Sequence, residues 1–221
     1  MQAYPTAFFK KINYSWKRFR RVTARQPDPV EYVNKRRQIQ HLMALNALGY
    51  LDLRFADETG FSLLPNVPYG WLPRGKQCGI LANKKRVLNL FGLMSLQQDL
   101  VCYPTSKSIN AQFIVECLDN FAEGLEKTTV VVLDQASWHR SVKVQQKWKE
   151  WQRKNLFIFF LPRYSPHLNA IEILWRNMKY RWLKPKDFLN AATLKSAIFH
   201  LIERFGTEFC IDFSMNFSLL H

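Results

Sequence analysis

The sequence of 221 residues has no apolar run long enough to cross a membrane, which takes about 18–20 such residues. It also lacks the charged and then apolar start of a secretion signal. Its four cysteines stand far apart, at Cys78, Cys102, Cys117 and Cys210, and no two of them form a C-x-x-C pair. These absences predict a cytoplasmic protein with no membrane partner, whose thiols are reduced and form neither a zinc site nor a disulfide framework.

Acidic residues are also scarce. The chain has 17 Asp and Glu against 32 Lys and Arg, which gives a net charge of +15. Such an excess favours a polyanionic partner, and DNA or RNA comes first among these. A merely basic soluble protein is the alternative. Because 48% of the residues are hydrophobic and 14% are aromatic, the chain can form a substantial globular core.

The first 25 residues carry basic and aromatic side chains but no acidic ones. A helix is predicted over residues 5–21, and basic residues mixed with aromatic ones suit contacts with phosphates. The candidate DNA-binding residues of this arm are Lys17, Arg18, Arg20 and Arg21. A solvated basic helix whose aromatic side chains dock on the core is an equally good interpretation. The proline-rich residues 26–29 then indicate a linker.

Hydrophobic patterning after this linker predicts an α/β domain. Extended patterns cover residues 51–57, 85–96, 99–103, 130–133 and 156–161. Helical patterns cover residues 30–47, 108–126, 142–154, 170–183 and 194–205. Three antiparallel strands followed by alternating helices and strands predict a mixed five-stranded sheet flanked by helices. Residues 60–75 are rich in turn formers and predict a hairpin, near whose tip Trp71, Arg74 and Lys76 could contact flanking DNA.

Three acidic residues stand where such a sheet places its chemistry. Asp57 and Asp134 each end a predicted strand, and Glu172 opens a predicted helix. The strand order brings the two aspartates to one edge, and the helix can return across that edge. Carboxylate oxygens are the ligands that Mg²⁺ and Mn²⁺ prefer. Each acid alone is explained as well by a turn, a cap or the helix dipole, so the signal lies in their combination.

That combination resembles a known family. Residues 57–61 (DETGF), 133–141 (LDQASWHRS) and 161–172 (LPRYSPHLNAIE) resemble the three acidic motifs of DDE transposases, in the bacterial insertion-sequence branch of the mariner-like superfamily. The resemblance covers about residues 14–185. It implies a ribonuclease H-like, retroviral-integrase-like fold. It further implies that Asp57, Asp134 and Glu172 are catalytic and bind two Mg²⁺ or Mn²⁺ ions.

The same resemblance implies an activity and partners. Hydrolysis at transposon ends would be followed by strand transfer from the freed 3′-hydroxyl. The partners would be double-stranded DNA, as transposon ends and as target, and a second copy of the chain on paired ends. A bacterial, nucleoid-associated location follows from this interpretation.

The sequence departs from the family pattern at several positions. Gln135 stands where Asn is usual, His167 where Asp is common and Ala170 where Pro is common, and none of these removes a metal ligand. Family members usually carry helix-turn-helix modules at the N-terminus, of which only an end is visible here. This chain therefore suggests a split reading frame with a separate helix-turn-helix subunit, a truncated chain or a decayed copy.

Several other residues are candidates for supporting roles. His139 could contact the scissile phosphate or assist proton transfer, and a purely structural histidine is at least as good an interpretation. Asn169 is expected to brace the loop before Glu172. Basic residues that could line a DNA path, if they are not simply solvated, include Arg140, Lys143 and Lys179.

The predicted division has four parts. Residues 1–26 form a basic arm, the remnant of a helix-turn-helix region, and residues 27–50 a linker and helix. Residues 51–185 form the DDE catalytic domain, and residues 186–221 a C-terminal helix and tail. Two alternatives to a transposase remain: a ribonuclease H-like nuclease that cuts DNA without joining it, and a catalytically silent DNA-binding remnant.

Overall fold

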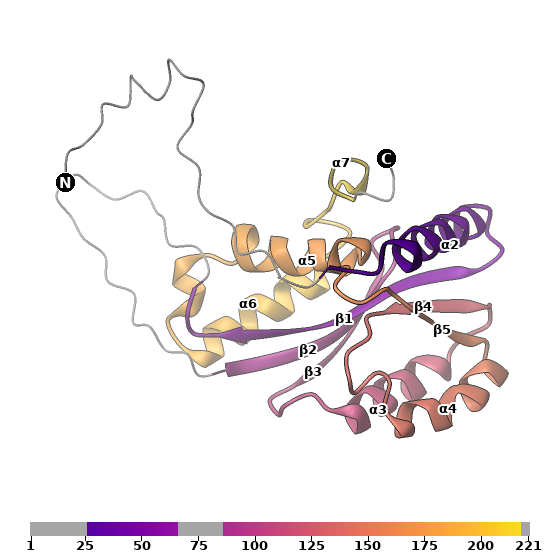
Figure 1. Ribbon diagram of the computed structural model, residues 1–221. Coiled ribbons are helices and arrows are strands. Elements are labelled where there is room, and N and C mark those ends of the chain that lie inside the picture. Colours follow the sequence, from indigo (N-terminus) through magenta and orange to yellow (C-terminus); the bar gives the residue numbers. More distant parts are fainter. Residues whose placement is uncertain (1–25, 66–85, 218–221) are drawn as a thin grey trace, which may run out of the picture.

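A single mixed sheet organises the protein. The computed structural model describes residues 26–65 and 86–217. Its strands are β1 (Asp52–Ser62), β2 (Arg86–Met94), β3 (Leu100–Thr105), β4 (Thr129–Leu133) and β5 (Leu156–Phe160), in the sheet order β3-β2-β1-β4-β5 (Figure 1). The first three strands are antiparallel neighbours, whereas β4 runs parallel to β1 and β5 parallel to β4. The predicted mixed five-stranded sheet is confirmed.

Helices cover both faces of this sheet. The α-helices are α2 (Pro29–Ala47), α3 (Ala111–Ala122), α4 (Val142–Arg153), α5 (Ile171–Asn177), α6 (Ala191–Glu203) and α7 (Phe213–Asn216). Short 3₁₀ turns at Pro166–Leu168 and Pro185–Phe188 and a π-helical turn at Met178–Trp182 lie between them. Figure 1 shows α3 and α4 on one side of the sheet and α5 and α6 on the other. The domain therefore has three layers.

Alternation along β1 assigns its side chains to the two faces. Phe55 and Phe61 belong to the core under α5 and α6, whereas Ala56 belongs to the core under α3 and α4. By the same alternation, Asp57 lies on the α5 side and its neighbour Glu58 on the α4 side. Two consecutive acids of one strand thus serve opposite faces of the sheet.

The prediction that Asp57 ends its strand is wrong. β1 continues to Ser62 because the antiparallel neighbour β2 goes on pairing with it, with Gly92 opposite Asp57. The parallel pairing with β4 stops earlier, at Phe55 and Val132. Asp57 therefore lies just beyond the point where β4 leaves the sheet, which is where a cavity can open.

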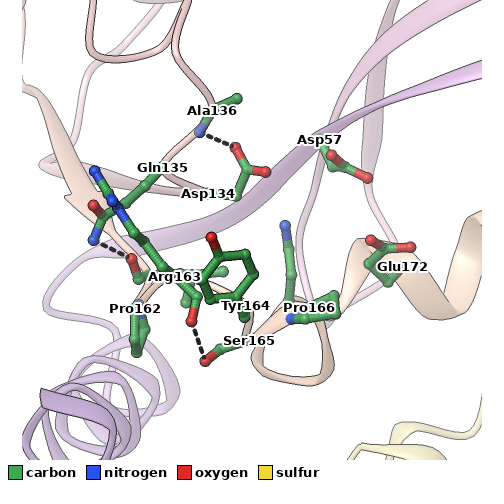
Figure 2. Close-up of a pocket in the computed structure, with 12 residues that line it drawn as sticks. Asp57, Asp134, Gln135, Ala136, Pro162, Arg163, Tyr164, Ser165, Pro166 and Glu172 are labelled. Carbon is green, nitrogen blue, oxygen red and sulfur yellow. Dashed lines mark hydrogen bonds between the residues drawn. The ribbon is translucent and has the colours of Figure 1, made fainter. Parts of the chain in front are cut away.

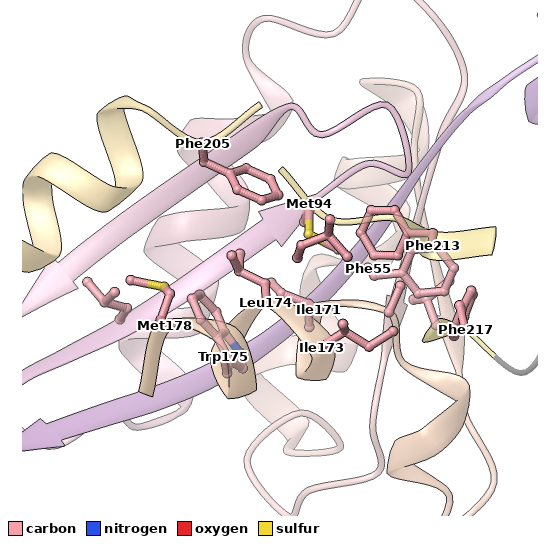
Figure 3. Packing of buried hydrophobic residues seen from close by; sticks show 14 of the residues in the cluster. Phe55, Met94, Ile171, Ile173, Leu174, Trp175, Met178, Phe205, Phe213 and Phe217 are labelled. Carbon is pink, nitrogen blue, oxygen red and sulfur yellow. The ribbon is translucent and has the colours of Figure 1, made fainter. Parts of the chain in front are cut away.

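The C-terminal tail, for which the sequence predicts no element, is part of the core. Ile211, Phe213 and Phe217 are buried, and the Phe217 ring meets Phe55 edge to face at 5.5 Å between centroids (Figure 3). The helix predicted over residues 170–183 is α-helical only in its first part and continues as the π-helical turn. The tail is fixed by a contact with a distant segment, Phe55 of β1, which the local sequence does not reveal.

Some of the predicted residues lie outside the described ranges. They are Lys17, Arg18, Arg20, Arg21, Trp71, Arg74 and Lys76. Within residues 26–65 and 86–217, no helix has the length and apolar character to cross a membrane.

Candidate functional site

Three acids from separate elements line one cavity on the α5 side of the sheet. Asp57 comes from the middle of β1, Asp134 follows the last residue of β4, and Glu172 lies in the first turn of α5 (Figure 2). The cavity has a volume of about 470 Å³, and segments 134–136 and 161–166 form the rest of its wall together with Asn169. The three predicted motifs therefore meet at one place.

Buried contacts hold Glu172 opposite Asp57. Ile171 and Trp175, on either side of Glu172 along α5, pack against Gly92, the β2 residue opposite Asp57. The loop before α5 is tied down by buried Asn169, whose Nδ2 donates to the backbone carbonyl of Ala56 at 3.0 Å. That hydrogen bond is the brace that the sequence predicts for Asn169, and it attaches the loop directly beside Asp57.

The two loops of the cavity wall are bound to each other through Gln135. Its side-chain amide donates to the Leu161 carbonyl at 2.9 Å and to Glu31 Oε1 on α2 at 3.3 Å. Further along this wall, Tyr164 has a φ of 59°, a left-handed conformation that is costly for a bulky side chain. Residues held in such conformations often cluster at functional sites. Gln135, which departs from the family pattern, thus connects the two loops of the cavity wall.

The surroundings of two of the acids, Asp57 and Glu172, disfavour the ionised form of the carboxyl group. Burial raises the pKa of Asp57 well above its ordinary value, and the charges of Glu172, Glu58 and Asp134 raise it further. Desolvation also raises the pKa of Glu172, assisted by Asp134 and opposed by Lys179 and Arg176. A cation between the carboxylates would remove this repulsion.

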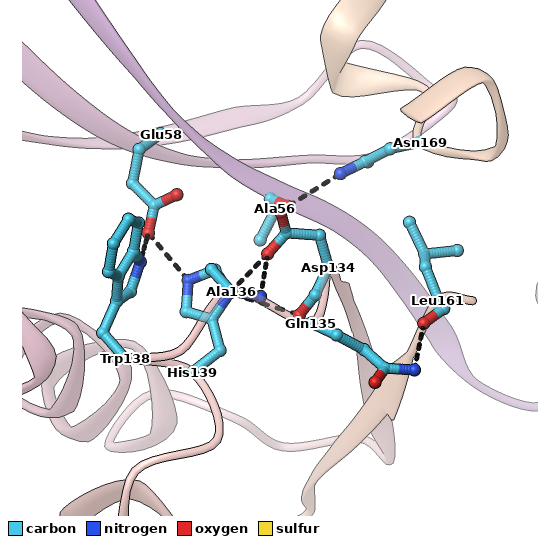
Figure 4. A network of polar contacts seen from close by, with 9 residues as sticks. All are labelled: Ala56, Glu58, Asp134, Gln135, Ala136, Trp138, His139, Leu161 and Asn169. Carbon is cyan, nitrogen blue, oxygen red and sulfur yellow. Dashed lines mark hydrogen bonds and ion pairs between the residues drawn. The ribbon is translucent and has the colours of Figure 1, made fainter. Parts of the chain in front are cut away.

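Asp134 behaves in the opposite way. Burial would raise its pKa, but hydrogen bonds from His139 and the Ala136 amide together lower it. Burial likewise opposes the charge of His139, yet its hydrogen bonds to Asp134 and Glu58 raise its pKa to about 10. The ring nitrogens lie 2.8 Å from Asp134 Oδ1 and 2.7 Å from Glu58 Oε1 (Figure 4). Since carboxylates only accept, both nitrogens of this histidine donate.

These contacts favour the structural interpretation of His139. The residue is fully buried, at 0% exposure, and both ring nitrogens are engaged, so the ring presents no atom to a DNA phosphate. The sequence-based selection missed its partner Glu58. A signal was available, because two consecutive acids in a strand must face opposite sides of the sheet.

The cavity suits a hard divalent cation. In the described part of the chain, no three Asp, Glu, His or Cys side chains converge closely enough to enclose an ion. The three carboxylates instead face an open space, which fits Mg²⁺ or Mn²⁺ because these ions keep several water ligands beside one or two carboxylates. A cation bound there would oppose the burial and the neighbouring acids that raise the pKa of Asp57.

The structure describes three of the basic candidates, and none of them lines the acidic cavity itself. Arg140 and Lys143 are exposed on the segment that follows Asp134, and Arg140 Nη1 donates to Gln135 Oε1 at 3.3 Å. Lys179 is partly buried and lines a second cavity of about 540 Å³, whose wall Glu172 shares. Glu172 thus forms part of the wall of both cavities.

Comparison with known proteins places these features in a family. The model of the family described as DDE superfamily endonuclease matches residues 52–195, which is more than half of the chain. An uncharacterized protein of Sinorhizobium fredii, y4pE/y4sA, is 37% identical over 59 residues. Those residues are 27% of this chain and 39% of that protein, so the chain matches well under two thirds of this relative.

Solved structures share the fold. The Mos1 mariner paired end complex with Mn aligns with a TM-score of 0.56 and 14% identity, over 90% of this chain and 67% of that one. The Mos1 Strand Transfer Complex aligns with a TM-score of 0.55 and 13% identity, over 98% of this chain and 64% of that one. At such identities the likeness concerns the fold alone, and it confirms the predicted ribonuclease H-like arrangement.

Proposed function

The chain belongs to the DDE superfamily endonucleases, and we propose that it is a transposase catalytic domain that cuts DNA at transposon ends and joins the freed 3′-hydroxyl to target DNA. Asp57, Asp134 and Glu172 are the proposed ligands of two Mg²⁺ or Mn²⁺ ions. The observation that carries the proposal is the meeting of these three acids, from three distant segments, around one cavity.

Each acid would have a distinct part in holding the ions. Asp57 is held by the pairing of β1 with β2, two residues beyond the point where the pairing of β1 with β4 ends. Asp134 is oriented by His139 and the Ala136 amide, and Glu172 is held by the packing of α5. Ions bound there would activate the attacking water or 3′-hydroxyl oxygen and stabilise the leaving oxygen of an in-line displacement.

The proposed partner is double-stranded DNA, bound by two copies of the chain on paired ends. The net charge of +15 supports a polyanionic partner. Solved structures that share the fold include a Mos1 transposase paired-end complex with the left transposon end and a Mos1 strand transfer complex. Recognition of the ends would need the basic arm of residues 1–26 or a separate helix-turn-helix subunit, and the protein would then act at the bacterial nucleoid.

A joining assay tests this function. The chain is incubated with Mn²⁺ or Mg²⁺ and labelled duplex carrying the ends of its own element, and nicked and joined products are scored separately. We expect both products to require the metal, and both to disappear in the Asp134→Ala variant, because the cavity then loses one proposed ligand. DNA binding by that variant, measured by fluorescence anisotropy, should remain close to that of the unsubstituted protein.

Other outcomes favour the alternatives. Nicking without joining indicates a nuclease, and DNA binding without either reaction indicates a silent remnant or a missing recognition subunit. Adding a helix-turn-helix subunit in trans separates the last two. Cleavage that persists in Asp134→Ala contradicts the assigned site.

Lys179 should contribute to DNA binding. It lies beside Glu172 in the second cavity, where burial lowers the pKa of Lys179 and the charges of Glu172 and Asp57 oppose that lowering. We expect Lys179→Ala to weaken binding and to reduce the slope of log affinity against log salt concentration by about one, as for the loss of one phosphate contact. The matched control is Lys127→Ala, which replaces an exposed lysine just before the first residue of β4. Equal salt slopes for the two variants contradict a phosphate contact at Lys179.

A further inference from the structure

A chain of hydrogen bonds connects the α4 side of β1 with Asp134 in the wall of the acidic cavity. Trp138 Nε1 donates to Glu58 Oε1 at 3.0 Å, and the same oxygen accepts from His139 Nε2 at 2.7 Å. On its other side, His139 Nδ1 donates to Asp134 Oδ1 at 2.8 Å (Figure 4). Glu58 does not line the acidic cavity but a smaller one of about 220 Å³, which it shares with Trp138.

This chain distinguishes the two oxygens of Asp134. Oδ1 accepts from His139 Nδ1 and also from the Ala136 amide at 2.9 Å, so both of its lone pairs are used. Figure 2 shows the other oxygen on the side that faces Asp57. The Asp134 side chain is 50% exposed although the histidine behind it is fully buried. One oxygen is thus held by the protein while the other is presented to the cavity.

We propose that Glu58, acting through His139, is a positioning residue that fixes Asp134 so that its second oxygen can bind a divalent cation. The inference rests on the proposed function, since it concerns the same carboxylate. It adds a residue outside the three acids, on the opposite face of β1. Trp138 forms the outer, solvent-side end of this chain of hydrogen bonds because its Nε1 donates to the Glu58 carboxylate.

Stability alone is a poor explanation for the arrangement. A histidine at 0% exposure between two carboxylates has lost its hydration, and replacing such buried ion pairs by apolar residues is often neutral or stabilising. What an apolar group cannot supply is a directed donor to one oxygen of Asp134. Partners that orient a metal ligand in this way typically change metal affinity or activity by about 10–100-fold when they are removed.

The test measures Mn²⁺ binding without DNA, by electron paramagnetic resonance of the free ion. We expect Glu58→Ala to weaken binding by about tenfold or more, because His139 then loses the partner that holds its ring. Glu58→Gln should bind Mn²⁺ almost as the unsubstituted protein does. The amide that Glu58→Gln introduces can accept from Nε2 of a protonated His139 or donate to Nε2 of a neutral one, and in both cases Nδ1 continues to donate to Asp134. Glu126→Ala, which replaces an exposed acid just before the first residue of β4, should leave the Mn²⁺ affinity unchanged.

Kinetics of DNA cleavage provide a second reading. A positioning role predicts a lower kcat for Glu58→Ala with a KM for DNA within about twofold of the unsubstituted value, as for an interaction that matters in the transition state. Thermal unfolding confirms that each variant is folded at the assay temperature. If Glu58→Ala does not fold, Trp138→Phe replaces it. Trp138 is 40% exposed, and this change deletes only the outer hydrogen bond, so we expect binding weakened by about threefold.

The outcomes separate this inference from the proposed function. If folded Glu58→Ala, or Trp138→Phe in its place, binds Mn²⁺ as tightly as the unsubstituted protein does, the proposed role of Glu58 is overturned. The transposase proposal then still stands. Equal losses in Glu58→Ala and Glu58→Gln also overturn it, because the hydrogen bond would then not be the cause. Absence of Mn²⁺ binding by the unsubstituted protein overturns both.

Discussion

Replacing Asp57 with Asn should abolish cleavage and at the same time stabilise the metal-free protein. The loss of activity is expected because Asp57 is the proposed ligand closest to the middle of the sheet, and removing a group that acts as part of a catalytic set typically costs about 10³-fold or more. The gain in stability is expected because burial and the neighbouring acids Glu172, Glu58 and Asp134 all disfavour the ionised carboxyl. Opposite effects of one substitution are characteristic of a functional site.

The pH dependence of this gain has a definite sign. The pKa of Asp57 is raised in the folded protein, so the folded state holds the proton more tightly than the unfolded state does. The free energy of unfolding of the metal-free protein therefore falls as the pH rises from the ordinary range of a carboxyl to above the raised pKa. Asp57→Asn removes this contribution. Its advantage should vanish at low pH and reach roughly 1 kcal/mol at high pH.

Thermal unfolding in EDTA at several pH values measures this advantage. For a domain of this size, 1 kcal/mol corresponds to a shift in Tm of about 2–4 °C. Added Mn²⁺ should raise the Tm of the unsubstituted protein more than that of the variant, since only the former retains all three carboxylates. Glu126→Gln, at an exposed position, makes the same chemical change and should alter neither property. If metal-free Asp57→Asn is less stable than the unsubstituted protein at every pH, the ionised Asp57 carboxyl does not destabilise the metal-free protein, and this prediction is wrong.

The sequence predicts most of the sheet and singles out the three acids that line the cavity. β4 contains the apolar run of residues 130–133, which Asp134 follows, and the structure shows all five residues of the strand buried, as the pattern predicts for a central strand. The motif that contains Glu172 predicts the loop and helix that follow β5. Such features are local, because each can be read from a short stretch of the chain without knowledge of its neighbours.

Features that depend on contacts between distant segments could not be predicted in this way. The continuation of β1 beyond Asp57 depends on pairing with β2, and the burial of Phe217 depends on the ring of Phe55. The role of Glu58 depends on His139, 81 positions further along the chain. Alternation along β1 places Glu58 on the α4 side, but no periodic pattern identifies His139 as its partner or Phe217 as the partner of Phe55, so these contacts are seen only in the assembled fold.

Gly92 is the clearest example of such a non-local requirement. It pairs with Asp57 across β1 and β2, and a Cβ at this position would lie 2.8 Å from Trp175 Cη2 and 3.1 Å from Ile171 Cδ1. Both contacts come from α5, the helix that carries Glu172. The missing side chain therefore allows α5 to approach the sheet closely enough to bring Glu172 to the cavity. In the sequence alone, this glycine only weakens a strand pattern.

Gly92→Val should displace α5 and with it Glu172. Forcing extra carbon atoms into a packed core typically costs about 1–3 kcal/mol, and a displacement of about 1 Å can lower a rate by about 10²-fold. We expect a lower Tm and cleavage reduced to that extent, with DNA binding retained. Gly124→Ala, where a Cβ meets nothing within 4 Å, is the matched control and should change neither property.

A compensating substitution shows whether packing against α5 is the cause. The Trp175 atoms nearest to the added Cβ belong to the six-membered ring, and Phe at this position is shorter. Gly92→Ala combined with Trp175→Phe should therefore recover part of the activity that Gly92→Ala alone loses, because α5 can return toward the sheet. Additive losses in the double variant would contradict this explanation, since coupled neighbours deviate from additivity whereas independent sites do not. Recovery would establish that a missing side chain on β2 sets the distance between two of the three acids.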